Sequence, residues 1–116
     1  MKKKRGGLLN ELEQKIQACS ELQNNYESQI NFLTNRNENY NYVYKQTFNP
    51  DCDWSYKIYI NKNIYKNILE YRQSLIDDIC YNNNLIEQYK KLLQKSINIS
   101  TFLQKIYFFI NFNIKK

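Results

Sequence analysis

The chain of 116 residues has no histidine, two glycines, one proline and three cysteines. A zinc site would therefore be short of its usual nitrogen and sulfur ligands, because no CxxC or twin-cysteine spacing occurs. An odd number of cysteines also leaves one thiol outside any disulfide framework. Since there is no catalytic signature either, we expect a protein that is not an enzyme and holds no metal and no cofactor.

Cys52 is the cysteine with the most unusual surroundings, since it lies in a predicted turn between Asp51 and Asp53. Two neighbouring carboxylates disfavour the thiolate that a nucleophile requires, so we do not expect catalysis by Cys52. Cys19 falls on an apolar stripe, where its role as a small buried side chain explains it.

No apolar run follows the N-terminal sequence MKKKRGG, so the sequence predicts no secretory signal. Glu11 and Glu13 argue against a typical transit peptide, which is poor in acidic residues. Because the cysteines show no pairing pattern, we expect reduced thiols. The sequence therefore favours an intracellular, reducing compartment, and the cytoplasm over an organelle matrix.

Asparagine, lysine, isoleucine and tyrosine are abundant, and all four have AT-rich codons. We therefore treat the asparagine content as a sign of genome composition and not of function. Hydrophobic residues make up 42% of the chain although the mean hydropathy is −0.76. Because the hydrophobic residues recur periodically, this composition favours a long helical protein over a disordered one.

The longest regular pattern runs from Leu9 to Tyr44, where the spacing between mainly apolar residues alternates between three and four. An α-helix places residues at this spacing on one narrow stripe, the seam of a coiled coil. The stripe consists of Leu9, Leu12, Ile16, Cys19, Gln23, Tyr26, Ile30, Leu33, Asn37, Tyr40 and Tyr44. No proline or glycine interrupts it, and so narrow a stripe needs a helical partner to cover it.

A second helical pattern begins near residues 61–63 and continues toward the C-terminus. Its stripe follows the same spacing through Ile68, Tyr71, Leu75, Asp78, Asn82, Leu85, Tyr89, Leu92, Ser96, Ile99, Leu103, Ile106 and Ile110. Ile79, Ile86 and Leu93 widen this stripe to one side, which suits a helix that faces two neighbours. Asn82–Asn84 and Ser96–Thr101 are its weakest stretches, where the helix could bend or divide.

Between the two helical patterns the hydrophobic period changes to two. Tyrosine, valine and isoleucine alternate with other residues on both sides of an Asn-Pro-Asp turn signal centred on Pro50. We interpret residues 42–60 as a β-hairpin or an extended irregular tip. The alternative is that the first helix continues to Gln46, because Tyr44 still lies on its stripe.

The formal net charge is +6, and it is unevenly distributed. Lys2–Arg5 carry four positive charges, the predicted first helix has a net charge of −3 from Leu8 to Tyr44, and the chain from Lys45 onward carries +5. An acidic first helix and a basic remainder are suited to pack together. Binding of nucleic acid through Lys2–Arg5 is the alternative use of the charge. We do not favour it, because neither a Gly-rich phosphate loop nor an RNP-type aromatic motif is present.

The last stretch of the chain, residues 101–116, is its most apolar part. Its apolar side chains surround a helix instead of lining one face, and we expect a partner-binding site made of Phe102, Ile106, Phe108, Phe109, Ile110 and Phe112. Spanning a bilayer takes about 20 mostly apolar residues, so this shorter, interrupted segment favours docking to a protein. Interfacial contact with a membrane is the alternative, because lysines follow the aromatic residues.

A helix, a β-rich tip and a returning helix resemble the β-type prefoldin subunits. The resemblance rests on the Leu9–Tyr44 stripe, the alternation at Val43–Lys45 and Ser55–Ile60, and the Ile64–Leu103 stripe. It implies an antiparallel coiled coil whose β-hairpin assembles a hexamer and whose helix ends hold unfolded clients. Where that family usually has a glycine between the strands, this chain has Asn49–Trp54.

The predicted fold is mainly α, an antiparallel coiled-coil helical hairpin with a short extended or β-hairpin tip. The expected segments are a flexible basic arm at 1–7, a hairpin at 8–100 (helix about 8–40, tip about 41–61, helix about 62–100) and an apolar aromatic docking tail at 101–116. A fold-back near residue 52 would pair residues whose numbers add up to about 100–105, such as Glu13 and Lys90. The tail would then extend past the start of the first helix.

We expect the chain to be a non-catalytic coiled-coil subunit that scaffolds a larger protein assembly. Its partners would be other protein subunits in a hetero-oligomer. A prefoldin-like co-chaperone that holds unfolded clients is the first alternative. A small basic RNA- or ribosome-associated protein is the second.

Overall fold

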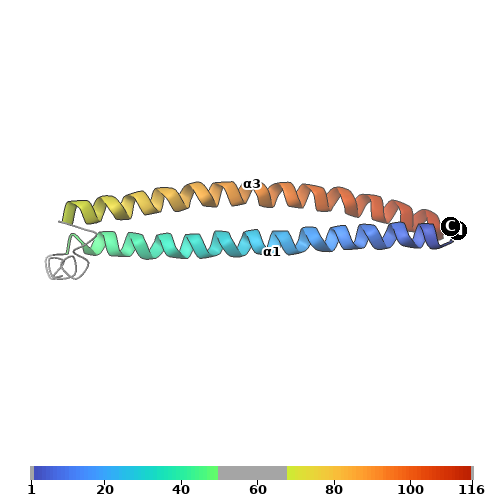
Figure 1. The fold of residues 1–116 in the computed structure, drawn as a ribbon, viewed down its shortest axis with the longest axis horizontal. Helices are drawn as coiled ribbons and strands as arrows, with labels where there is room; N and C mark the ends of the chain where they lie inside the picture. Colours follow the sequence, from blue (N-terminus) through green and yellow to red (C-terminus); the bar gives the residue numbers. More distant parts are fainter. Residues whose placement is uncertain (1, 50–67, 116) are drawn as a thin grey trace. The chain divides into compact units, whose positions relative to one another are not determined.

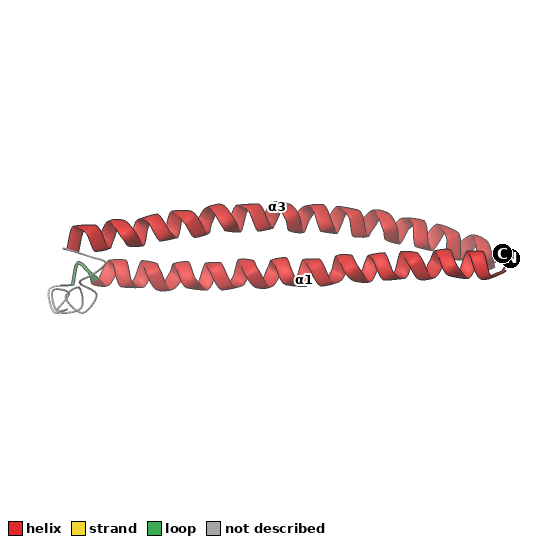
Figure 2. Cartoon of the chain, in the orientation of Figure 1, coloured by secondary structure: helices red, strands yellow, loops and turns green. Residues whose placement is uncertain are grey.

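The computed structural model describes residues 2–49 and 68–115, with side chains for residues 7–49 and 68–113. Two helices make up nearly all of this part of the chain, α1 (Lys2–Gln46) and α3 (Ile68–Lys115) (Figures 1 and 2). A short turn follows α1, and the described residues contain no strand. The predicted mainly α class is therefore confirmed.

The internal contacts divide the chain into two units, each made from a stretch of both helices. Unit 1 comprises residues 1–29 and 88–116, and unit 2 comprises residues 30–87. Each unit has its own set of contacts between α1 and α3.

In unit 1, three contacts show how the start of α1 pairs with the end of α3. The Tyr107 hydroxyl donates a hydrogen bond of 2.7 Å to the Glu13 carboxylate. The Ser96 hydroxyl donates one of 3.2 Å to the Cys19 backbone carbonyl. The Tyr26 ring of α1 packs against the Tyr89 ring of α3, and their centroids are 6.1 Å apart. Residue numbers rise along α1 as they fall along α3, so the pairing is antiparallel, and Figure 1 shows the start of α1 beside the end of α3.

In unit 2, polar side chains make the contacts that join the two helices. Asn37 donates a hydrogen bond of 2.9 Å to the Asn83 side-chain oxygen and accepts one of 3.0 Å from Asn82. Arg72 donates to the hydroxyl (2.9 Å) and the backbone carbonyl (2.8 Å) of Thr47. The Arg72 guanidinium also lies 3.8 Å from the centre of the Phe48 ring. This pairing is antiparallel too, which confirms the predicted helical hairpin.

The register of the pairing differs from the sequence-based prediction. Contacts such as Cys19–Ser96, Glu13–Tyr107 and Asn37–Asn82 join residues whose numbers add up to 115–120, and not to about 100–105 as a turn near residue 52 requires. The predicted approach of Glu13 to Lys90 is therefore wrong. The reason is that α1 continues as helix to Gln46, which moves the fold-back toward the C-terminus.

The start of the predicted tip, residues 42–46, is helical, so the alternative of a longer first helix is correct there. The Thr47 amide donates hydrogen bonds of 3.1 Å to the carbonyls of Val43 and Tyr44, which continue the helical ladder past the end of α1. The apolar spacing of three and four thus outweighs the period-two alternation of tyrosine and valine. The remainder of the predicted tip, residues 50–60, lies outside the described residues.

Helix also extends through three stretches where the sequence suggested otherwise. α1 begins at Lys2, so residues 2–7 of the predicted flexible arm are helical, and α3 runs unbroken through Asn82–Asn84 and Ser96–Thr101. Asparagine and serine weaken a helix when their side chains bond to their own backbone. Here Asn82 and Ser96 bond to α1 instead, which removes that competition.

The hydrophobic core among the described residues is thin. Its buried apolar side chains are Leu12, Leu33, Leu75 and Ile86, each 6–8% exposed. An almost equal set of polar side chains is buried beside them, namely Asn37, Thr47, Asn82, Ser96 and Ser100. Every buried side-chain nitrogen and oxygen in the described part of the chain has a hydrogen-bond partner, so these polar groups carry little desolvation penalty.

Candidate interaction surface

The seam residues expected on α1 lie against the other helix or at its edge. Leu12 and Leu33 are buried, and Leu9, Ile16, Tyr26 and Ile30 are half-buried. The seam residues expected on α3 are more dispersed. Leu75 is buried, Ile68 and Leu85 are half-buried, and Leu92 is 43% exposed.

This dispersion arises because α3 carries two apolar stripes and only one of them is covered. The covered stripe alternates steps of four and three, and all of its members are buried or half-buried. It consists of Leu75, Ile79, Asn82, Ile86, Tyr89, Leu93, Ser96, Ser100, Leu103, Tyr107 and Ile110. Asn82, Tyr89, Ser96 and Tyr107, which contact α1, all belong to this stripe, whereas Asn83 and Arg72 contact α1 from outside it.

Each residue of the second stripe of α3 directly precedes a residue of the covered stripe. In unit 1 it contains Leu92, Ile99, Phe102, Ile106 and Phe109, with Lys95 between the first two. A shift of one residue rotates a side chain by about 100° around the helix axis. The second stripe therefore points past α1 and not toward it. Its apolar side chains are 43–70% exposed, apart from the half-buried Ile106.

The start of α1 adds apolar side chains on the same side of unit 1. Since both helices are right-handed and run in opposite directions, the residues that precede each seam lie on a common side of the pair. On α1 these residues are the apolar Leu8, Ala18 and Leu22 and, between them, Glu11 and Lys15, whose opposite charges cancel; all five are exposed. We call the set formed by Leu8, Ala18, Leu22, Leu92, Ile99, Phe102, Ile106 and Phe109 the apolar face of unit 1.

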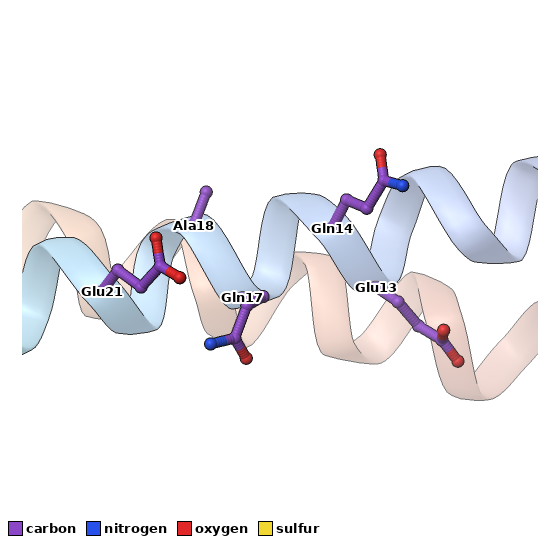
Figure 3. A pocket seen from close by; sticks show the side chains of 5 residues that line it. All are labelled: Glu13, Gln14, Gln17, Ala18 and Glu21. Atoms are coloured by element: carbon purple, nitrogen blue, oxygen red, sulfur yellow. The ribbon is translucent and has the colours of Figure 1, made fainter.

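The opposite side of α1 is polar. The residues that follow each seam position in unit 1 are Asn10, Glu13, Gln17, Ser20, Asn24 and Glu27. Figure 3 shows Ala18 and Gln14 projecting to one side of α1 and Gln17 and Glu13 to the other. The surface depression drawn there is lined by polar side chains of α1 together with Ala18. It contains no nucleophile beside a base.

The residues expected to form the C-terminal docking site do not share one side of α3. Phe102, Ile106 and Phe109 belong to the apolar face, whereas Ile110 belongs to the covered stripe. Phe108 and Phe112 lie on other sides of the helix and are 68% and 60% exposed. The tail does not extend past α1 as predicted, because Tyr107 contacts Glu13 near the start of that helix.

Charge is concentrated in the α3 part of unit 1. From Gln88 to Lys116 the sequence has six lysines and no acidic residue. Across the pair, the hydrogen bond to Glu13, followed by desolvation and the nearby charge, raises the pKa of Tyr107 above its ordinary value of 10.0. In unit 1, α3 therefore contributes basic residues and no acidic ones, whereas the sequence of α1 contributes all four glutamates together with Lys2–Arg5 and Lys15.

The described residues contain no group of three histidine, cysteine, aspartate or glutamate side chains placed to hold a metal ion. Cys19 is a half-buried free thiol and Cys80 an exposed one. Cys52 lies outside the described residues. Within the described part of the chain, neither helix has a stretch apolar enough and long enough to traverse a bilayer.

Two features that join the helices were not anticipated from the sequence. The asparagine cluster of unit 2 had a visible signal, since Asn37 and Asn82 both fall on the predicted stripes. The contact of Arg72 had no such signal in the sequence, because its partner Thr47 lay within the predicted tip. No family model, curated protein or solved structure matches the chain.

Proposed function

We propose that the chain is a non-catalytic coiled-coil subunit that scaffolds a larger protein assembly. The observation that carries the proposal is the apolar face of unit 1, a regular exposed stripe on a helix whose other stripe is already covered. Helices with a wide apolar surface of this kind are typical of bundles with more than two members. A contiguous exposed apolar surface on a soluble protein is an association site or a liability.

The proposed partners are other protein subunits in a hetero-oligomer, in an intracellular reducing compartment. The thin core supports the need for partners, because four buried apolar side chains are few for two helices of 45 and 48 residues. Two-helix pairs of this kind gain much of their stability when a third or fourth helix covers the remaining apolar surface.

The proposal is tested by following the tagged full chain in extracts of its native source on a native sizing column. Replacing both Phe102 and Phe109 with serine should move the chain from a large species to its own size, with helix content unchanged by circular dichroism. The matched control is Phe108→Ser, which removes an equally exposed ring from another side of α3. A wild-type chain that elutes at its own size in every extract contradicts the proposal.

A prefoldin-like co-chaperone is a second candidate, supported by the helical hairpin and by the exposed phenylalanines near the end of α3. Purified chain would then suppress aggregation of an unfolded protein at stoichiometric amounts. A scaffold would leave that aggregation unchanged.

A small RNA- or ribosome-associated protein is the third candidate, supported by the six lysines and missing acidic residues after Glu87. Its association with RNA would weaken steeply as salt rises, since each neutralised phosphate releases counterions. Association through the apolar face would persist at high salt, because burial of apolar surface does not depend on screening.

A further inference from the structure

We infer that the apolar face of unit 1 binds an acidic amphipathic helix from another protein, laid along α3. This inference rests on the proposed function and specifies the chemistry of the partner. It joins two independent observations, the spacing of the exposed apolar residues and the sign of the charges around them.

The spacing indicates a helix. Ile99, Phe102, Ile106 and Phe109 follow one another at steps of three, four and three, and Leu92 lies one heptad before Ile99. Such spacing presents knobs and holes at the repeat of a second helix and not at the repeat of a strand. From Leu92 to Phe109 the stripe is about 25 Å long, which a partner helix of about 17 residues would cover.

The edge of the face provided by α1 also suits a helix. Ala18 is exposed and small, so it leaves space between the larger side chains of Leu22 on α1 and Phe102 on α3. A third helix packed there would contact α1 and α3 together. The angle of about 100° between the two stripes of α3 is close to that between neighbours in a helical bundle.

The charges indicate an acidic partner. Lys95 interrupts the second stripe itself, and Lys91 and Lys105 lie one position beyond it on the same helix. No acidic residue of α3 lies between Gln88 and Lys115 to neutralise them. Opposite charges beside an apolar seam determine which helices pair, and they favour a partner with glutamate or aspartate at the flanking positions.

A second copy of the chain is a poorer occupant for the same reason. A two-fold interface brings a surface patch against itself, so the lysine-rich stretch of one α3 would approach that of the other. Like charges beside a coiled-coil seam oppose pairing. The charge pattern therefore selects a different chain over a homodimer.

The test uses the purified full chain and two fluorescent peptides of about 21 residues that have leucine at both seam positions. One peptide has glutamate at the flanking positions, and its matched control has lysine. Fluorescence anisotropy should show saturable binding of the acidic peptide and none of the basic one. Raising salt to about 1 M should weaken this binding without abolishing it.

Two neighbouring variants sharpen the result. Phe109→Ser removes a ring from the apolar face, and Phe108→Ser removes one of nearly equal exposure (68% against 70%) from another side. Because burying a phenylalanine ring is worth about tenfold or more in affinity, Phe109→Ser should weaken peptide binding by at least about that factor. Phe108→Ser should change it less than about twofold.

The inference is overturned if both peptides bind equally, if the two variants lose equal affinity, or if the acidic peptide does not bind. It is also overturned if light scattering shows a dimer that Phe109→Ser dissociates, or if anionic vesicles bind the chain in a Phe109-dependent way. Failure here is separate from failure of the proposed function. A chain that still enters its native assembly through Phe102 and Phe109 has a partner of different chemistry, whereas one that binds the peptide but enters no assembly is not a scaffold.

Discussion

Units 1 and 2 join the same two helices, but they do so with different kinds of side chain. Unit 2 uses directional polar contacts, including the Asn37–Asn82 pair and the bonds from Arg72 to Thr47. Unit 1 has fewer such contacts and a broad exposed apolar surface. Its eleven basic and four acidic residues give it a net charge of +7, whereas six basic and seven acidic residues give unit 2 a net charge of −1.

The comparison shows a division of roles within one pair of helices. A buried asparagine pair accepts only one alignment of the helices, because any other alignment leaves an amide without a hydrogen bond. Unit 2 therefore sets the register. Unit 1 has the Ser96–Cys19 and Tyr107–Glu13 hydrogen bonds between its helices, and its outer apolar residues are exposed and take no part in the alignment.

The largest expected effect distinguishes the seam of unit 2 from its surface. Leu75 is 6% exposed and Leu69 is 68% exposed on the same helix. Leu75→Asp should destabilise the chain by about 3 kcal/mol or more, because a carboxylate would lose its hydration in the seam. Leu69→Asp should stay within about 0.5 kcal/mol of the wild type. Urea denaturation followed by circular dichroism measures both, and similar losses would refute the burial difference.

The next effect tests the arginine contact at the end of α1. Arg72→Ala removes two hydrogen bonds to Thr47 and the contact with the Phe48 ring, and it should cost about 1–2 kcal/mol. Arg36→Ala is the control, since Arg36 contacts Tyr40 and Phe32 on its own helix α1. Its cost should not exceed about 0.5 kcal/mol. Equal costs would mean that Arg72 does not connect the helices.

A third prediction concerns register rather than stability alone. Asn82→Ala leaves the Asn37 amide without one of its partners and should cost about 1 kcal/mol. Replacing both Asn37 and Asn82 with leucine should restore or raise stability but permit more than one alignment. Lysine crosslinking reads out the alignment, with Lys15–Lys105 expected in the wild type. A double variant with that single crosslink would show that the asparagines do not set the register.

The smallest effect belongs to the tyrosine contact of unit 1. The raised pKa of Tyr107 means that folding favours the protonated hydroxyl, which donates to Glu13. This contribution is present below the ordinary tyrosine pKa of 10.0 and is lost as the pH rises through the raised value. Tyr107→Phe should therefore lower the melting temperature slightly at pH 8 and not above that raised pKa. A difference that is independent of pH would exclude the hydrogen bond as its cause.

The sequence was sufficient for the class of fold, and on α1 the unbroken spacing of three and four indicated the side that is buried or half-buried. It was not sufficient for α3. The stripe predicted for α3 and the stripe that is covered share Leu75, Tyr89 and Leu103, so the spacing alone fits either Ile86 and Leu93 or Leu85 and Leu92 as the covered side. Only the burial of individual residues distinguishes them.

The position of the fold-back was also beyond the sequence pattern. Pro50 is a strong turn signal, yet the register depends on where helix ends and begins again on each side of the connection. Those ends are Gln46 and Ile68 among the described residues. The six residues expected in the C-terminal tail fall on several sides of α3, as their spacing predicted, but the spacing did not show which of them lie on the apolar face.

The two described cysteines make the opening of unit 1 measurable as a chemical rate. Cys80 is an exposed thiol in unit 2, and Cys19 is a half-buried thiol on the seam of unit 1. With Cys52 replaced by serine, Cys80 should react with an alkylating reagent at the speed of a free thiol, whereas Cys19 should wait for the helices to separate locally. The ratio of the two rates then reports how often unit 1 opens, and a bound helix on the apolar face should slow the reaction of Cys19 alone.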